Sequence, residues 1–118
     1  MQTSIQALGF PLTDALENHV HNRLGFTFSR ISGRVRRVNV RLSDLNGPRG
    51  GIDKSCLIEV RLDALPAVVV EDVQPDMYIA IDRAIGRASR SVLRRLSVKN
   101  SKRRDQAVQL AHHPSPGL

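Results

Sequence analysis

The sequence predicts an α+β fold of the order β-α-β-β-β-α, with a four-stranded mixed sheet and both helices packed on one face. Two stretches repeat apolar residues every three to four positions, as amphipathic helices do, and other stretches alternate apolar and polar residues, as half-buried strands do. A strand, a helix and a second strand in succession imply a right-handed crossover, after which the remaining strands add as antiparallel neighbours. With 118 residues, 41% of them apolar, the chain has room for one such domain.

The first strand and the first helix occupy the beginning of the chain. A short strand at residues 5–8 is ended by Gly9 and Pro11. Thr13 has the side chain of an N-cap, and an acid follows it in the first turn. We therefore expect an amphipathic helix from about 13 to 28. Its apolar residues recur every four positions: Leu16, Val20, Leu24 and Phe28.

Three further strands are predicted between the two helices. Residues 35–42 alternate, and the turn-forming residues 43–51 separate them from a second alternating run at 56–62. The apolar run 67–73 lies close enough to pair antiparallel with its predecessor. The open face of this sheet is predicted to leave three polar side chains of its second strand at least partly exposed: Arg37, Asn39 and Arg41.

The second helix begins at Pro75 and Asp76, because proline is tolerated and an acid is favoured at that end. Its apolar residues fall within one arc of about 100°: Met77, Ile81, Ile85, Ala88, Val92 and Leu96. Four arginines fall in an arc of about 60° on nearly the opposite side: Arg83, Arg87, Arg90 and Arg94. The pattern fades after Leu96, so we expect a domain at 1–98 and a basic, then Pro- and His-containing tail at 99–118, disordered from about residue 100.

The net charge of +7 is concentrated in the last helix. Residues 1–82 carry 9 basic and 10 acidic side chains, whereas residues 83–104 carry 9 basic side chains and no acid. Arginine outnumbers lysine 15 to 3, which favours planar, bidentate contacts with phosphate or carboxylate. An anionic polymer is therefore the expected partner. With 3 Phe and 1 Tyr, base-stacking platforms are missing, so we expect recognition of backbone charge and shape.

Several other classes of protein are not expected. The longest apolar stretch, 64–70, is far too short to cross a bilayer, and the apolar arc of the last helix is needed for the sheet. The single cysteine, Cys56, is expected to be a buried apolar residue, and the cytoplasm is the expected compartment. Because His19 and His21 diverge on a helix and no zinc-like spacing exists, we expect no metal, no cofactor and no catalytic site.

Residues 76–82, with the sequence Asp-Met-Tyr-Ile-Ala-Ile-Asp, resemble the opening of the last helix in one known family. The segments 13–16 and 28–31 are similar to that family's bounds on the first helix. Over roughly residues 1–97 the chain resembles the hibernation-promoting factor and ribosome-associated inhibitor family, once called sigma-factor modulation proteins. It resembles the short form, because it has no room for the second, dimerising domain of the long form. Its hairpin tip is similar to that of a divergent proteobacterial subgroup, and its first helix is almost a turn shorter than in the familiar members. The resemblance implies binding to the decoding region of the small ribosomal subunit.

The resemblance assigns an rRNA-contact role to Arg23, Arg87, Arg90 and Arg94, and leaves Arg83 as an addition of this sequence. Our hypothesis is that the last helix lies along rRNA phosphates of the small ribosomal subunit, obstructs the decoding channel, and inhibits translation or stabilises idle ribosomes during stress or stationary phase. The predicted RNA-binding residues are Arg23, Arg37, Arg41, Arg83, Arg87, Arg90, Arg94, Arg95 and Lys99.

Two alternatives use the same basic helix. The first is a protein-binding regulator, for example of a sigma factor, that contacts an acidic partner. The second is a nonspecific DNA-binding protein. An exposed sheet face or edge strand also leaves room for a weak homodimer.

Overall fold

The computed structural model describes residues 1–45 and 52–110, with side chains described as far as Ser97. Its elements are β1 (Gln2–Leu8), α1 (Asp14–Thr27), the 3-10 turn η1 (Ser32–Arg34), β2 (Val35–Asp44), β3 (Lys54–Leu62), β4 (Leu65–Gln74) and α2 (Met77–Leu110). The predicted order β-α-β-β-β-α is confirmed.

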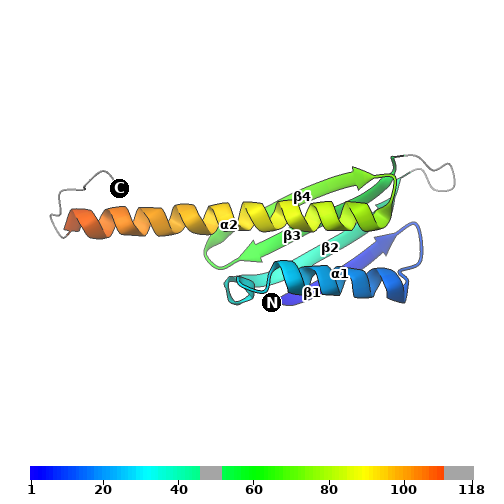
Figure 1. Ribbon diagram of the computed structural model, residues 1–118, viewed down its shortest axis with the longest axis horizontal. Coiled ribbons are helices and arrows are strands. Elements are labelled where there is room, and N and C mark those ends of the chain that lie inside the picture. The colour runs from blue at the N-terminus through cyan, green and yellow to red at the C-terminus, as the bar shows by residue number, and fades with distance from the viewer. Residues whose placement is uncertain (46–51, 111–118) are drawn as a thin grey trace.

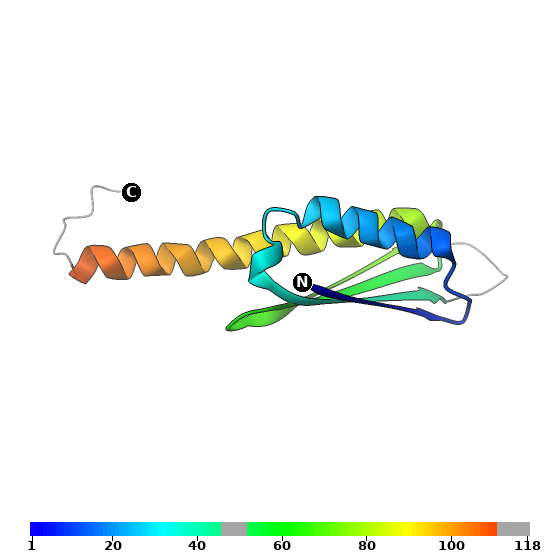
Figure 2. The same ribbon diagram turned by 90° about the horizontal axis from the view of Figure 1, so that it is seen from below.

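The four strands form one mixed sheet in the order β1-β2-β3-β4. β1 pairs with β2 in parallel, and the other two pairings are antiparallel. Both helices lie on the same face of this sheet, side by side, and the opposite face carries no helix (Figures 1 and 2). α2 packs on β3 and β4 and also contacts α1. The mixed sheet with two helices on one face is therefore confirmed.

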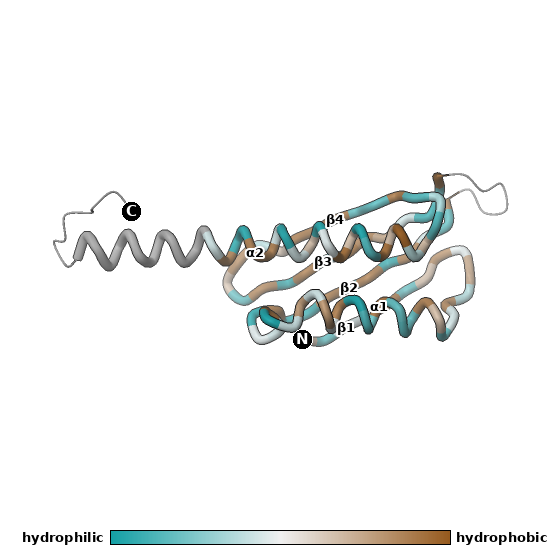
Figure 3. The backbone as a smooth tube through the Cα atoms, viewed as in Figure 1, coloured by the Kyte–Doolittle hydropathy of each residue, from teal (hydrophilic) through white to brown (hydrophobic). Residues whose placement is uncertain are grey.

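The core fills the space between the sheet and the helices. The whole apolar arc predicted for α2 is buried, and Ala80 and Ala84 complete the same face. Apolar and polar positions alternate with the helical period along α1 and along the coloured part of α2 (Figure 3). The largest fully buried apolar side chains come from both helices, β2 and β3: Phe28, Leu24, Leu42, Ile58, Ile81 and Ile85. Removing one such side chain from a core typically costs about 2–5 kcal/mol, so this cluster fixes how α2 lies on the sheet.

The boundaries of α1 agree with the prediction to within one residue. Thr13 is the N-cap, and its Oγ1 accepts a hydrogen bond from the backbone N–H of Leu16 at 3.2 Å. The helix ends at Thr27, and Phe28 is its C-cap, whose N–H donates to the carbonyl of Leu24. The buried residues of α1 are Leu16, Val20 and Leu24.

All four strands are longer than predicted. β1 begins at Gln2 because its polar first residues pair with β2, which hydropathy alone does not indicate. β2 runs on to Asp44, and Lys54 Nζ, at the start of β3, donates to Asp44 Oδ1 at 3.0 Å and thereby holds the strand ends together. The tip of the predicted turn, 46–51, lies outside the described residues.

α2 is also longer than predicted and continues to Leu110. From the loss of its apolar pattern after Leu96, the sequence predicts disorder from about residue 100 instead. No Gly or Pro stands between Leu96 and Leu110, so no local signal ends the helix there. The division of the chain into a binding domain at 1–98 and a tail at 99–118 stays a prediction, and residues 111–118 lie outside the described part.

Cys56 is buried in β3 against the helices, as the sequence predicted. Burial, with a further contribution from the negative charge of Asp72, raises the pKa of its thiol to about 12. Because the thiolate is the reactive form, we expect native protein at pH 8 to resist a thiol-specific reagent, whereas urea-unfolded protein reacts within minutes. Absorbance of the released thiol product measures both rates. Equal rates in the two states would contradict the burial of this side chain.

Candidate nucleic-acid interface

The exposed surface of α2 is built by a capped and anchored helix. The Asp76 carboxylate accepts a hydrogen bond from the backbone N–H of Tyr78 at 2.8 Å, and the Asp76 carbonyl accepts one from Ala80 at 3.0 Å. The first bond satisfies a backbone donor at the start of the helix that has no intrahelical partner, and the second is the first regular hydrogen bond of the helix. Because the apolar face of α2 is held in the core, its opposite face is fixed toward solvent. We call the four side chains on that face the arginine stripe: Arg83, Arg87, Arg90 and Arg94.

The two halves of the arginine stripe have different surroundings. Arg83 Nε lies 3.4 Å and Arg87 Nη1 lies 3.2 Å from Oδ2 of Asp72, a buried carboxylate on β4. Arg87 Nη1 also donates to the backbone carbonyl of Glu71 at 2.9 Å. The first half of the stripe is therefore tied to the sheet. Nothing in the α2 sequence indicates this, because the acid comes from β4.

Asp72 lies on the helix side of β4, following the buried Val68 and Val70 in the alternation. Burial alone would raise the pKa of this carboxyl, but hydrogen bonds from Gln74 and Arg87, together with the charge of Arg83, lower it below its usual value. Asp72 is thus a buried anion that needs both arginines. A charged residue at a core position of a strand is the sequence signal that could have revealed this partner.

Arg90 and Arg94 form the second half of the stripe, and neither lies within ion-pair distance of a carboxylate among residues 1–45 and 52–97. Arg94 Nη2 donates to Ser91 Oγ at 3.2 Å. Their guanidinium groups are therefore available to an external anion. Arg95, which was also predicted to bind RNA, instead donates a hydrogen bond from Nη1 to the backbone carbonyl of Pro66 at 2.8 Å. The side chain of Lys99 lies outside the described part of the chain.

Arg23 reaches the same side of the molecule from α1. Its Nε lies 3.1 Å from Asp82 Oδ1, and His19 Nε2 lies 2.7 Å from the same oxygen. The His19 ring also packs edge-on against Tyr78, with centroids 4.9 Å apart. The carboxylate of Asp82 thereby joins the two helices and holds Arg23 at the seam between α1 and α2. The contact between His19 and Asp82 could not be predicted from the sequence, because the two residues are 63 positions apart in the chain.

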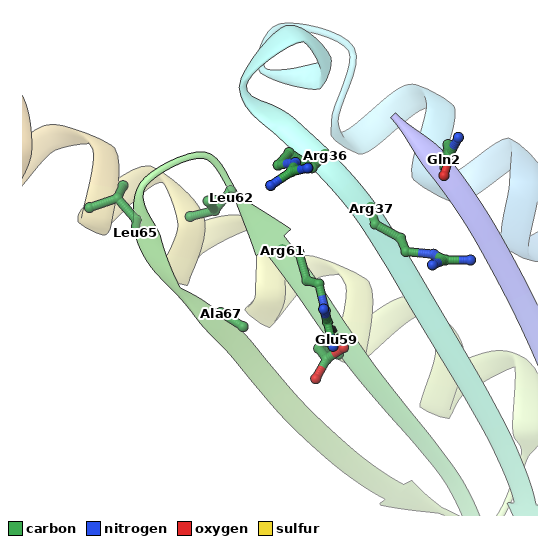
Figure 4. Close-up of a pocket in the computed structure, with 8 residues that line it drawn as sticks. All are labelled: Gln2, Arg36, Arg37, Glu59, Arg61, Leu62, Leu65 and Ala67. Carbon is green, nitrogen blue, oxygen red and sulfur yellow. Dashed lines mark hydrogen bonds and ion pairs between the residues drawn. The ribbon is translucent and has the colours of Figure 1, made fainter.

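Arg37 and Arg41 are exposed, and they alternate along β2 with the buried Val38, Val40 and Leu42, so they lie on the open face of the sheet, on the far side from both helices. Figure 4 shows Arg37 on this face. The structure therefore divides the predicted contact residues into two groups. One lies around α2 and the adjoining side of α1, and the other lies on the opposite face of the sheet. A single flat surface of a partner cannot contact both groups together.

Two further structural findings concern other kinds of site. Within residues 1–45 and 52–110, no helix is both long and apolar enough to cross a membrane. In the same part of the chain, no cluster of three or more His, Cys, Asp or Glu residues is arranged to hold a metal ion.

The fold and the arginine stripe define a small β-α-β-β-β-α domain with one helix that is apolar toward the sheet and basic toward solvent. The chain belongs to the family described as sigma 54 modulation protein / S30EA ribosomal protein, which it matches over residues 3–100. The membership that the motif at residues 76–82 predicted is thereby confirmed. Among curated protein sequences, none matches this chain.

Solved structures that share the fold include two that match this chain over most of its length. The Protein Y N-terminal domain of Thermus thermophilus is 28% identical, and the match covers 80% of this chain and 98% of that one with a TM-score of 0.66. A ribosomal subunit interface protein from Coxiella burnetii is 13% identical, and the match covers 82% of this chain and 99% of that one with a TM-score of 0.71. The second likeness is one of fold alone.

Proposed function

We propose that this protein binds the small ribosomal subunit in the cytoplasm, contacts the rRNA backbone near the decoding region, and inhibits translation or stabilises idle ribosomes during stress or stationary phase. The observation that carries the proposal concerns two exposed arginines, Arg90 and Arg94, on a helix that is anchored in the core. Neither arginine has a carboxylate partner among the described residues. Membership of a family described as containing a ribosomal protein supports the choice of partner.

The chemistry favours contact with phosphates over reading of bases. A guanidinium group forms two parallel hydrogen bonds with a phosphate, and a rigid helix presents several such groups at fixed spacing. Successive stripe residues are three or four positions apart, which corresponds to a rise of about 4.5–6 Å along the helix axis. The stripe contains no aromatic side chain on which a base could stack. Binding would then follow the shape and charge of folded RNA.

Sedimentation of the protein with purified ribosomal subunits tests this function. We expect the chain to sediment with small subunits and to remain in the supernatant with large subunits alone. If about four phosphates are neutralised, raising salt from about 50 mM to about 200 mM should lower the association constant by about 100-fold. Binding that is unchanged by salt, or that is equal for both subunits, would contradict the proposal.

A protein-binding regulator is the second candidate, because the family description also names sigma 54 modulation. In that case the arginine stripe would contact acidic side chains of a protein partner. Affinity capture from a lysate treated with nuclease distinguishes the two functions. A stoichiometric protein partner that survives nuclease and is lost on replacement of Arg90 and Arg94 would favour regulation.

A further inference from the structure

Two irregularities of the sheet lie at the same end of its open face. The register shifts between Val35 and Arg37 in the β2–β3 pairing, and between Val60 and Leu62 in the β3–β4 pairing. The first shift breaks the alternation of β2, so that the consecutive residues Arg36 and Arg37 are both exposed. Bulges of this kind redirect side chains and are common beside functional sites. Here they gather arginines from two neighbouring strands.

A hollow of about 460 Å³ lies between these side chains on the open face (Figure 4). It is lined by Gln2, Arg36, Arg37, Glu59, Arg61, Leu62, Leu65 and Ala67. Three guanidinium groups therefore surround it, against one carboxylate. The hollow is open to solvent and lies on the face of the sheet that no helix covers (Figure 2).

The charges around the hollow are incompletely balanced. Arg37 stands directly opposite Arg61 in the β2–β3 register, an arrangement that is unfavourable between like charges. Arg61 Nε contacts Glu59 Oε1 at 3.1 Å, and Arg36 Nε contacts Asp63 Oδ1 at 3.3 Å. Both arginines are largely exposed, at 71% for Arg36 and 62% for Arg61, so their ion pairs are weak and each guanidinium group can turn toward another anion. Arg37 has no hydrogen bond or ion pair among the described residues.

We infer that the hollow lined by Arg36, Arg37 and Arg61 binds the phosphate backbone of a second RNA segment, so that one chain holds two RNA segments on opposite faces. A phosphate bound between Arg37 and Arg61 would neutralise the like charges on these paired strand positions, and the Gln2 amide lines the hollow as a further donor. The inference shares with the proposed function only the premise that the partner is RNA. It adds a second binding surface that α2 cannot supply.

A bridging assay with free RNA tests this inference without ribosomes. One short RNA hairpin is immobilised, a second hairpin carries a fluorophore, and the captured fluorescence is measured as protein is added at limiting amounts. The test variant is Arg37→Glu, whose new carboxylate faces Arg61, so the fold is expected to be retained. Arg90→Glu reverses one charge of the arginine stripe on α2. Arg30→Glu is the matched control, since Arg30 is exposed and does not line the hollow.

We expect wild-type protein and Arg30→Glu to capture the second hairpin. For Arg37→Glu and for Arg90→Glu, the captured fluorescence should fall at least about tenfold, while each variant still binds a single hairpin. Loss of the Arg37 contact should also make the slope of log association constant against log salt shallower by about 0.7–0.9. Light scattering at excess RNA should give a complex of one chain with two hairpins.

Capture by Arg37→Glu at the wild-type level would overturn the inference, as would a complex that contains two chains. Binding of inorganic phosphate by wild type without capture of a second hairpin would likewise overturn the assignment to RNA. The proposed function is tested by a separate experiment, the sedimentation of the protein with small ribosomal subunits. Bridging of free RNA without subunit binding would therefore leave the hollow established and the ribosomal role wrong.

Discussion

Replacement of both Arg90 and Arg94 by alanine is expected to lower the affinity for small ribosomal subunits by about 30- to 150-fold, since each lost charge-assisted contact is worth about 1–1.5 kcal/mol. The slope of log association constant against log salt should become shallower by about 1.4–1.8, which is about 0.7–0.9 for each lost contact. Because neither side chain forms an ion pair in the described structure, the free energy of unfolding should change by less than about 0.5 kcal/mol. Sedimentation at several salt concentrations and urea denaturation measure the two effects.

The matched control for this experiment is Arg30→Ala with Arg34→Ala, which removes the same charge from exposed positions outside α2. If the loss of affinity reflected net charge alone, both double variants would bind equally weakly. We expect the control to bind within about threefold of wild type, because contacts and not total charge set the salt dependence. If the variant that lacks Arg90 and Arg94 sedimented with small subunits as well as wild type does, the arginine stripe would not be the contact surface.

Replacement of Arg83 and Arg87 by alanine is expected to act on stability instead. It leaves the buried carboxylate of Asp72 with only Gln74 as a hydrogen-bond partner among those in the structure. Removing the partners of a buried charge costs several kcal/mol, and the partial exposure of both arginines reduces this to about 2 kcal/mol. The midpoint of urea denaturation measures the loss. Adding Asp72→Asn should recover much of the stability, because a neutral amide needs no counter-charge.

The pH dependence of the same variant follows from Asp72. In wild type its folded-state pKa is below the usual value, so its stabilising contribution is present above about pH 4 and is lost as the pH falls through the folded-state pKa. Without the two arginines, burial raises the pKa, and protonation then stabilises the folded state. The difference in unfolding free energy between wild type and variant should therefore shrink from pH 7 to pH 3. A difference that stays constant over this range would show that Asp72 does not carry the effect.

Much of the fold could be predicted from periodicity. The apolar arc of α2 and the repeat of α1 fix which faces are buried, and every residue predicted for those faces is in the core. The polar start of β1 and the continuation of α2 to Leu110 could not be predicted in this way. Edge-strand pairing depends on backbone hydrogen bonds, and a helix can continue through a stretch with no apolar period.

The site could be predicted less completely, because charges pair across elements. The exposure of the arginine stripe was evident from its position opposite the apolar arc. That Asp72 and Asp82 hold Arg83, Arg87 and Arg23 was not evident, since these acids lie on other elements or face a neighbouring helix. The bulge that exposes Arg36 beside Arg37 also has no signal in an alternating pattern. The role of these residues in RNA binding stays a prediction that the variants above test.

The length of α2 has a consequence for the speed of association. Beyond Leu96 the helix extends past the sheet (Figure 1), and Lys99, Lys102, Arg103 and Arg104 follow in that part of the sequence. At about 1.5 Å per residue, the residues from 97 to 110 extend the molecule by about 20 Å, more than twice the screening length of about 8 Å at physiological salt. An extended positive rod enlarges the distance from which a polyanion is captured, and so raises the rate of encounter even where it adds little to the final complex.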